Sequence, residues 1–203
     1  MIRFLRFPIG PRAAARVQLL ALAIALLAAP ARAASPELTR ETAGALGSFM
    51  QICARLMLGG DTAAAAATAG LVALPAAEAT RVLHGARGRV FAARGSAIGT
   101  MVLLLPERPL GCSMRLERMD VAGAESLFTR LAESIARPGL SVTRAYDGTI
   151  PTPNARPSRQ ITYRLSTGVA GRPDFAMLFT GNDDPAVGTQ GVLTFGTAAP
   201  RGQ

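Results

Sequence analysis

The 203-residue chain contains no lysine, no tryptophan and a single histidine, His84. Phosphate-binding loops of the G-x-x-x-x-G-K type need a lysine and the H-E-x-x-H zinc motif needs two histidines, so the sequence excludes both. No serine lies in a G-x-S-x-G motif, and the nearest segment, Arg94-Gly95-Ser96-Ala97, lacks the second glycine. The sequence therefore disfavours P-loop enzymes, zinc proteases and serine hydrolases of the standard type.

Residues 1–33 carry the three parts of an export signal in the required order. Arginines without any acidic residue precede an apolar run over residues 17–29, and Ala31-Arg32-Ala33 supplies the small residues that signal peptidase requires. The run has about a dozen residues, whereas a membrane-spanning helix needs roughly 20. We expect a cleavable signal peptide that is cut after Ala33; an uncleaved anchor or a buried core helix is the alternative.

The flanks of the apolar run indicate the route of export. No cysteine follows the run, which disfavours a lipoprotein anchor, and no Arg-Arg pair precedes it, which disfavours twin-arginine export. The mature protein is therefore expected to be periplasmic or secreted, with no stable membrane anchor and no cofactor.

The net charge of +9 becomes ordinary once the predicted signal peptide is excluded. Five of the 22 basic residues and none of the 13 acidic residues lie in residues 1–33, so 17 minus 13 leaves +4. Because tryptophan is absent, the chain also has little with which to stack on bases or sugars. We expect no nucleic-acid partner.

The two cysteines, Cys53 and Cys112, are predicted to form one structural disulfide, since an even pair in an oxidising compartment most simply bridges. Apolar residues alternate around Cys112, which places it on the inward face of a strand, within reach of a helix that carries Cys53. The spacing does not match C-x-x-C, which disfavours a redox-active or zinc-binding role.

The order of the predicted elements favours a single α+β domain over residues 34–198, with N-terminal helices and one later helix packed on an antiparallel β-sheet. Residues 34–86 are predicted to be the helical part. Residues 87–198 are predicted to form the sheet together with a helix over residues 120–137, and residues 199–203 a flexible tail.

Local patterns support these elements. Residues 61–74 are rich in alanine and favour helix, and residues 89–91 are predicted to form a short strand. Residues 100–105 are continuously apolar, which is typical of a strand covered on both faces. Asp120 is suited to cap the later helix. The first helix is indicated by an apolar stripe at i, i+3, i+7 and i+10, formed by Leu46, Phe49, Cys53 and Leu56.

Two polar features are candidate sites. His84 is a candidate general base, but near a helix end and beside Gly85 a histidine more often acts as a cap. The neighbours Asn182, Asp183 and Asp184 offer oxygen ligands for calcium, yet they lack the spacing of an EF-hand loop and precede a proline, so a turn is favoured over a metal site.

Five arginines are candidate ligand-binding residues: Arg87, Arg89, Arg94, Arg156 and Arg159. Gathered in one patch, they would bind phosphate, anionic lipid or a cell-wall carboxylate, because a guanidinium grips oxyanions with two donors. No aromatic residues are interleaved with them, and a solvated surface is the favoured alternative.

The sequence identifies no catalytic motif, so we expect a non-catalytic binding or accessory domain for an envelope protein or a small ligand. A small envelope enzyme that uses carboxylates such as Asp183, Asp184 or Glu117 is the alternative. A third possibility is an inhibitor or assembly factor that presents a sheet edge or the proline-rich residues 151–157 to its target. The oligomeric state stays open.

Processing and the disulfide are tested together by the intact mass of protein recovered from its own extracytoplasmic fraction. We expect a chain that begins at Ala34 and is lighter by about two hydrogens than the reduced chain. A full-length chain with free thiols would contradict both expectations.

Overall fold

The computed structural model describes residues 34–57, 59–108 and 110–198. Over these residues the chain is a single α+β domain with four helices and eight strands, which confirms the predicted fold class. The helices are α2 (Pro36–Met57), α3 (Thr62–Thr68), α4 (Ala76–Val82) and α5 (Val121–Ser134). The predicted signal peptide, residues 1–33, and the predicted tail, residues 199–203, lie outside the described residues.

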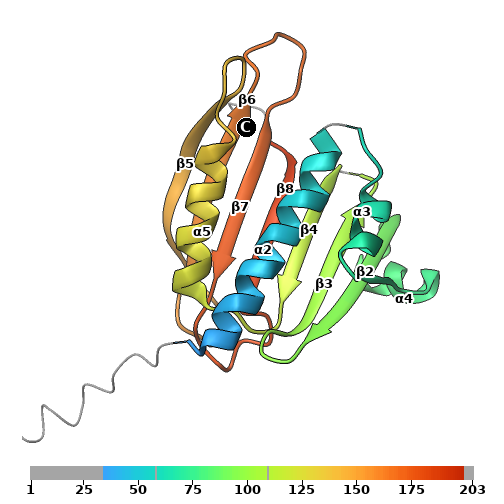
Figure 1. Ribbon diagram of the computed structural model, residues 1–203, viewed down its shortest axis with the longest axis vertical. Coiled ribbons are helices and arrows are strands. Elements are labelled where there is room, and N and C mark those ends of the chain that lie inside the picture. Colours follow the sequence, from blue (N-terminus) through green and yellow to red (C-terminus); the bar gives the residue numbers. More distant parts are fainter. Residues whose placement is uncertain (1–33, 58, 109, 199–203) are drawn as a thin grey trace, which may run out of the picture. The chain divides into compact units, whose positions relative to one another are not determined.

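All eight strands belong to one antiparallel sheet. They are β1 (Val72–Ala73), β2 (Gly88–Gly95), β3 (Gly99–Pro106), β4 (Gly111–Leu116), β5 (Ser141–Ile150), β6 (Ser158–Ser166), β7 (Phe175–Gly181) and β8 (Gly191–Thr197). The order across the sheet is β1-β2-β3-β4-β8-β7-β6-β5. Two meanders, β2–β4 and β5–β8, are therefore joined by the pairing of β4 with β8, and each meander follows a long helix in the sequence (Figure 1).

One face of the sheet, here called the helix face, is covered by α2 and α5 (Figure 1). Leu46 and Phe49 of α2 and Phe128 of α5 are at most 1% exposed. Inward-pointing strand residues complete this core: Met114, Leu116, Ile161, Met177, Phe179 and Leu193. Asp120 caps α5 as predicted, since its carboxylate accepts a hydrogen bond from the Gly123 N–H at 3.0 Å.

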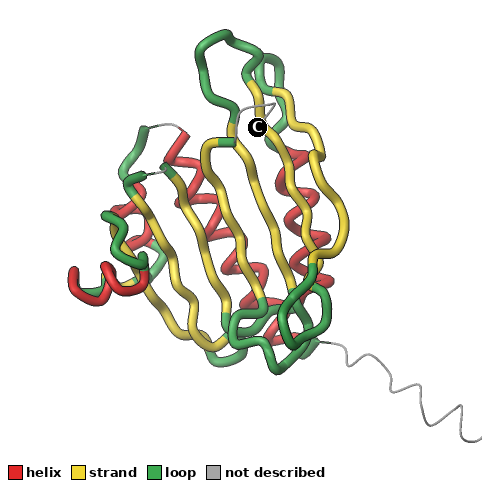
Figure 2. Tube along the Cα trace, turned by 180° about the vertical axis from the view of Figure 1, so that it is seen from behind, coloured by secondary structure: helices red, strands yellow, loops and turns green. Residues whose placement is uncertain are grey.

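The opposite face, here called the open face, is seen in Figure 2 without α2 or α5 in front of it. At one end it is covered by α4, where Ala79 and Leu83 pack with Val90 and Leu104 in a second, smaller cluster. Leu104 therefore points away from its neighbours in the main core, and β3 is buried on both sides at Leu103 to Leu105, while Val102 is only half-buried on the open face.

The N-terminal part departs from the prediction that residues 34–86 are helical. The alanine-rich helix α3 ends at Thr68, Gly70 adopts a positive φ of 77°, and the chain turns into β1. There Val72 pairs with Ala92 of β2. Both residues of β1 are exposed, so the edge strand is held by its backbone pairing with β2, and the left-handed conformation of Gly70 ends the helix. The predicted strand over residues 89–91 is likewise longer, because β2 and β3 form one hairpin.

The predicted disulfide is present. Cys53 of α2 and Cys112 of β4 are bonded, both are 1% exposed, and their Cα atoms are 5.6 Å apart. The apolar stripe of α2 and the alternation of β4 bring the two side chains together. The bond fixes the first helix to a central strand.

A carboxylate fixes the other end of α2 to the β2–β3 turn. Glu41 accepts hydrogen bonds from the Ser96 hydroxyl at 2.6 Å and from the backbone N–H groups of Ala97 and Ile98 at 3.0 and 2.9 Å. The bond from Ser96, followed by those from the backbone, lowers the pKa of Glu41 to about 2. Helix α2 is thus held at both ends.

Replacing both cysteines with alanine tests the contribution of the disulfide. The bridged positions are 59 residues apart, so we expect the free energy of unfolding to fall by about 4 kcal/mol in the chain-entropy description. Urea unfolding of the oxidised protein and the double variant measures the loss. Reductant should destabilise the wild type and leave the variant unchanged; equal urea midpoints for the two proteins would contradict the expectation.

The Glu41→Gln variant tests the carboxylate. Folding lowers the pKa of Glu41 from its ordinary value of 4.5 to about 2. The ionised carboxylate therefore stabilises the fold fully above pH 4.5, and this stabilisation disappears as the pH falls towards 2. The variant should unfold at lower urea than the wild type at pH 7, and the gap should shrink below pH 4.5. Glu107→Gln is the control, since the exposed Glu107 side chain has no partner in the described part of the chain. A gap that does not change with pH would refute this role.

Candidate functional site

A hollow of about 480 Å³ lies on the open face, between α4, strands β2 to β4 and the loop over residues 182–190. Small-molecule sites in proteins span about 300–1,000 Å³, so its size suits a ligand. Leu74 and Val82 form an apolar wall beside α4, and Gly188 and Thr189 form the opposite rim. This hollow is the candidate functional site.

The floor of the hollow is one row of cross-strand neighbours. Ala92 of β2 pairs with Val102 of β3, which pairs with Arg115 of β4. Side chains of directly paired residues point to the same face of an antiparallel sheet, so all three point to the open face. The row continues to Val192 of β8, which pairs with Arg115. The guanidinium of Arg115 therefore lies among aliphatic side chains.

Three charged groups line the hollow, and they differ in their partners. Arg115 and Glu78 are exposed, and neither side chain has a hydrogen bond or ion pair within the described residues. Glu117 instead accepts a hydrogen bond from the Thr100 N–H at 2.9 Å, and bonds from Thr100 hold the pKa of Glu117 below its ordinary value. The hollow thus offers one free cation and one free anion among the residues that the structure describes.

The candidate calcium ligands fold the rim loop. Asn182 is 3% exposed; its amide donates to the Arg156 carbonyl at 2.7 Å, and its Oδ1 accepts from the Asp184 N–H at 2.9 Å. Asp184 accepts from the N–H groups of Ala186 and Arg156, which lower its pKa. Asp183 forms an ion pair with Arg156 at 3.5 Å. The described residues contain no group of three or more His, Cys, Asp or Glu side chains placed to hold a metal ion.

The five candidate arginines do not form one patch. Arg87, Arg89 and Arg94 lie on or next to β2, whereas Arg156 precedes β6 and Arg159 lies within it. Four strands, β3, β4, β8 and β7, separate β2 from β6. Arg156 and Arg159 also have carboxylate partners. The placement favours the alternative of a solvated surface.

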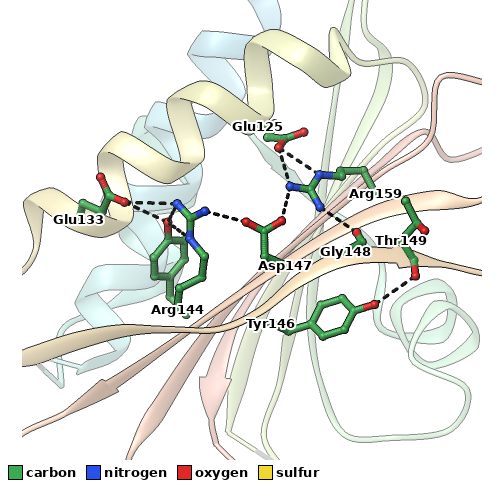
Figure 3. Close-up of polar contacts among 9 residues, drawn as sticks. Glu125, Glu133, Arg144, Tyr146, Asp147, Gly148, Thr149 and Arg159 are labelled. Carbon is green, nitrogen blue, oxygen red and sulfur yellow. Dashed lines mark hydrogen bonds and ion pairs between the residues drawn. The ribbon is translucent and has the colours of Figure 1, made fainter.

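Arg159 belongs to a charge network between α5 and strands β5 and β6 (Figure 3). It pairs with Glu125 at 2.8 Å and with Asp147, which also pairs with Arg144 at 2.6 Å. Arg144 reaches Glu133 at 3.3 Å. The bonds from Arg159 and then Arg144 lower the pKa of Asp147. Every charge in the network has an opposite partner, so its role is to hold α5 on the sheet.

A β-bulge makes this network possible. The register shifts between Arg144, which pairs with Tyr163, and Tyr146, which pairs with Thr162. In a regular strand, residues three apart point to opposite faces, but the bulge lets Arg144 and Asp147 both reach the helix face. The sequence does not predict this network. The alternation of residues along one strand shows neither a bulge nor the contacts of that strand with a helix.

The remaining candidate, His84, has an exposed side chain at the end of α4, with a positive φ of 52°. Its backbone N–H bonds to the Arg81 carbonyl at 3.1 Å and closes the last turn. Its side chain has no partner among the described residues. The position is that of a residue that ends a helix.

Comparison of the chain with models of known protein families, with curated proteins and with solved structures found no match. None of the helices in the described ranges has the length and apolar character needed to cross a membrane. The function of the chain is therefore inferred from the geometry of the hollow.

Proposed function

We propose that the chain is an exported, non-catalytic binding domain of the cell envelope that holds a small ligand in the hollow on the open face. The observation that carries the proposal is the hollow itself, where Arg115 and Glu78 stand without partners in the described residues beside the apolar side chains of Val82, Ala92 and Val102. Such mixed lining orients a ligand through its polar groups and holds it through apolar contact.

Export is supported by two features. The segment before Ala34 has the basic, apolar and small-residue parts of a signal peptide. The bond between Cys53 and Cys112 is of the kind that persists in oxidising compartments.

Binding without catalysis is supported by the state of the carboxylates. A general acid or base works best with a pKa near the operating pH, which for a carboxyl group means a raised pKa. The pKa values of Glu117 and Asp184 are instead lowered by hydrogen bonds from backbone N–H groups. Asp183 is paired with Arg156. The Glu117 carboxylate is thus engaged with strand β3 and the Asp184 carboxylate with the rim loop, which speaks against the alternative of a carboxylate enzyme.

A small ligand is favoured over a protein that adds a strand to the sheet. The long edge strand, β5, carries a bulge at Ala145 and the charged residues Arg144 and Asp147. Bulges and charges are devices that protect edge strands from pairing with other chains.

Filling the hollow tests the proposal. Ala92→Phe places a ring over the floor, and Thr162→Phe is the control, a half-buried strand residue on the open face outside the hollow. The small-molecule fraction of an envelope extract should raise the unfolding temperature of the wild type and of Thr162→Phe by about 3–6 °C for a ligand at ten times its Kd. Ala92→Phe should show no such rise. Native mass spectra should show bound ligand mass on the wild type and on Thr162→Phe, and none on Ala92→Phe. A rise in unfolding temperature that survives in Ala92→Phe would contradict the proposal.

A further inference from the structure

A second, smaller cavity of about 150 Å³ lies on the helix face, between the C-terminal parts of α2 and α5. It is lined mainly by apolar side chains, namely Phe49, Met50, Ile135, Leu140, Met177 and Phe195. Engineered apolar cavities of about 150 Å³ stay dry and bind benzene, so this cavity fits an apolar group of about six carbons.

A polar hollow of about 310 Å³ adjoins this cavity. Its lining includes Arg137, Ser141, Ser166 and Thr167, and it shares both Arg137 and Leu140 with the apolar cavity. Because the same two residues line both spaces, an apolar compartment and a polar compartment meet at Arg137. The mutual backbone hydrogen bonds of Arg137 and Leu140, at 3.2 and 2.8 Å, hold this junction in place.

The polar hollow presents hydrogen-bond donors. The Arg137 guanidinium has no partner within the described residues. The hydroxyl oxygens of Ser166 and Thr167 already accept the N–H groups of Gly168 and Val169, at 3.2 and 3.4 Å, which leaves their O–H groups to donate. A head group that accepts hydrogen bonds and carries negative charge complements this set.

We infer that these two adjoining cavities bind a small amphiphilic carboxylate, with its carboxylate on Arg137 and its apolar group of about six carbons between α2 and α5. The apolar cavity lies on the helix face, the polar hollow lies at the adjoining ends of β5 and β6, and neither shares a lining residue with the hollow on the open face. The inference therefore does not depend on the proposed function.

Hexanoate is the test ligand, with hexan-1-ol and acetate as analogues that lack the charge or the chain. We expect hexanoate to shift the methyl NMR signals of Met50, Leu140 and Met177, and to bind more tightly than either analogue. Arg137→Gln should weaken hexanoate binding about tenfold and leave hexan-1-ol binding unchanged. Arg40→Gln, a change at an exposed arginine of α2 outside both cavities, should change neither.

Two further variants fix the location. Ala54 is exposed on α2 and lines the apolar cavity, so Ala54→Phe should block both hexanoate and hexan-1-ol without disturbing the core. Ala92→Phe, in the other hollow, should leave hexanoate binding intact. The inference is overturned if hexanoate leaves these methyl signals unchanged, if Arg137→Gln binds it as tightly as the wild type, or if Ala92→Phe alone abolishes binding.

Discussion

The pairing of β4 with β8 is the contact on which the rest of the structure depends. It joins two meanders that would otherwise be separate sheets, and α2 packs across it with Cys53 bonded to Cys112 of β4. The end of the pair is closely packed, because a Cβ atom at Gly191 would lie 2.6 Å from the Met119 sulfur and the Met119 side chain would have to move to admit it.

The unequal covering of the two faces follows from this arrangement. The two long helices precede the two meanders and both lie on the helix face, so their apolar stripes form one large core. Among the described helices, the short helix α4 is the one that lies on the open face, where it covers β2 and β3 at one end. The hollow arises between this helix and the loop that Asn182 and Asp184 fold beside β4.

The charged residues divide into those that hold the fold and those that remain available. Glu41, Asp147 and Asp184 accept several hydrogen bonds each, and their pKa values are lowered accordingly. Arg115 and Arg137 border cavities and have no partner within the described residues. A charged side chain that already has partners adds little to ligand binding, whereas an unpaired one beside a cavity attracts a ligand group of opposite charge. Ligands are therefore expected at Arg115 and Arg137.

The sequence by itself determined the elements whose signal is local: the apolar stripe of α2, the alternation in β4, the Asp120 cap and the disulfide that the first two bring together. It named Glu117 but neither Arg115 nor Arg137 as a site residue, because a strand pattern shows which residues face outward and not which lie beside them. The row that joins Ala92, Val102 and Arg115, and the bulge that brings the charge network together, were decided by strand order and register. Register and bulge arise from the pairing of neighbouring strands, which a single strand pattern does not show and which the burial of the two helices on one sheet selects.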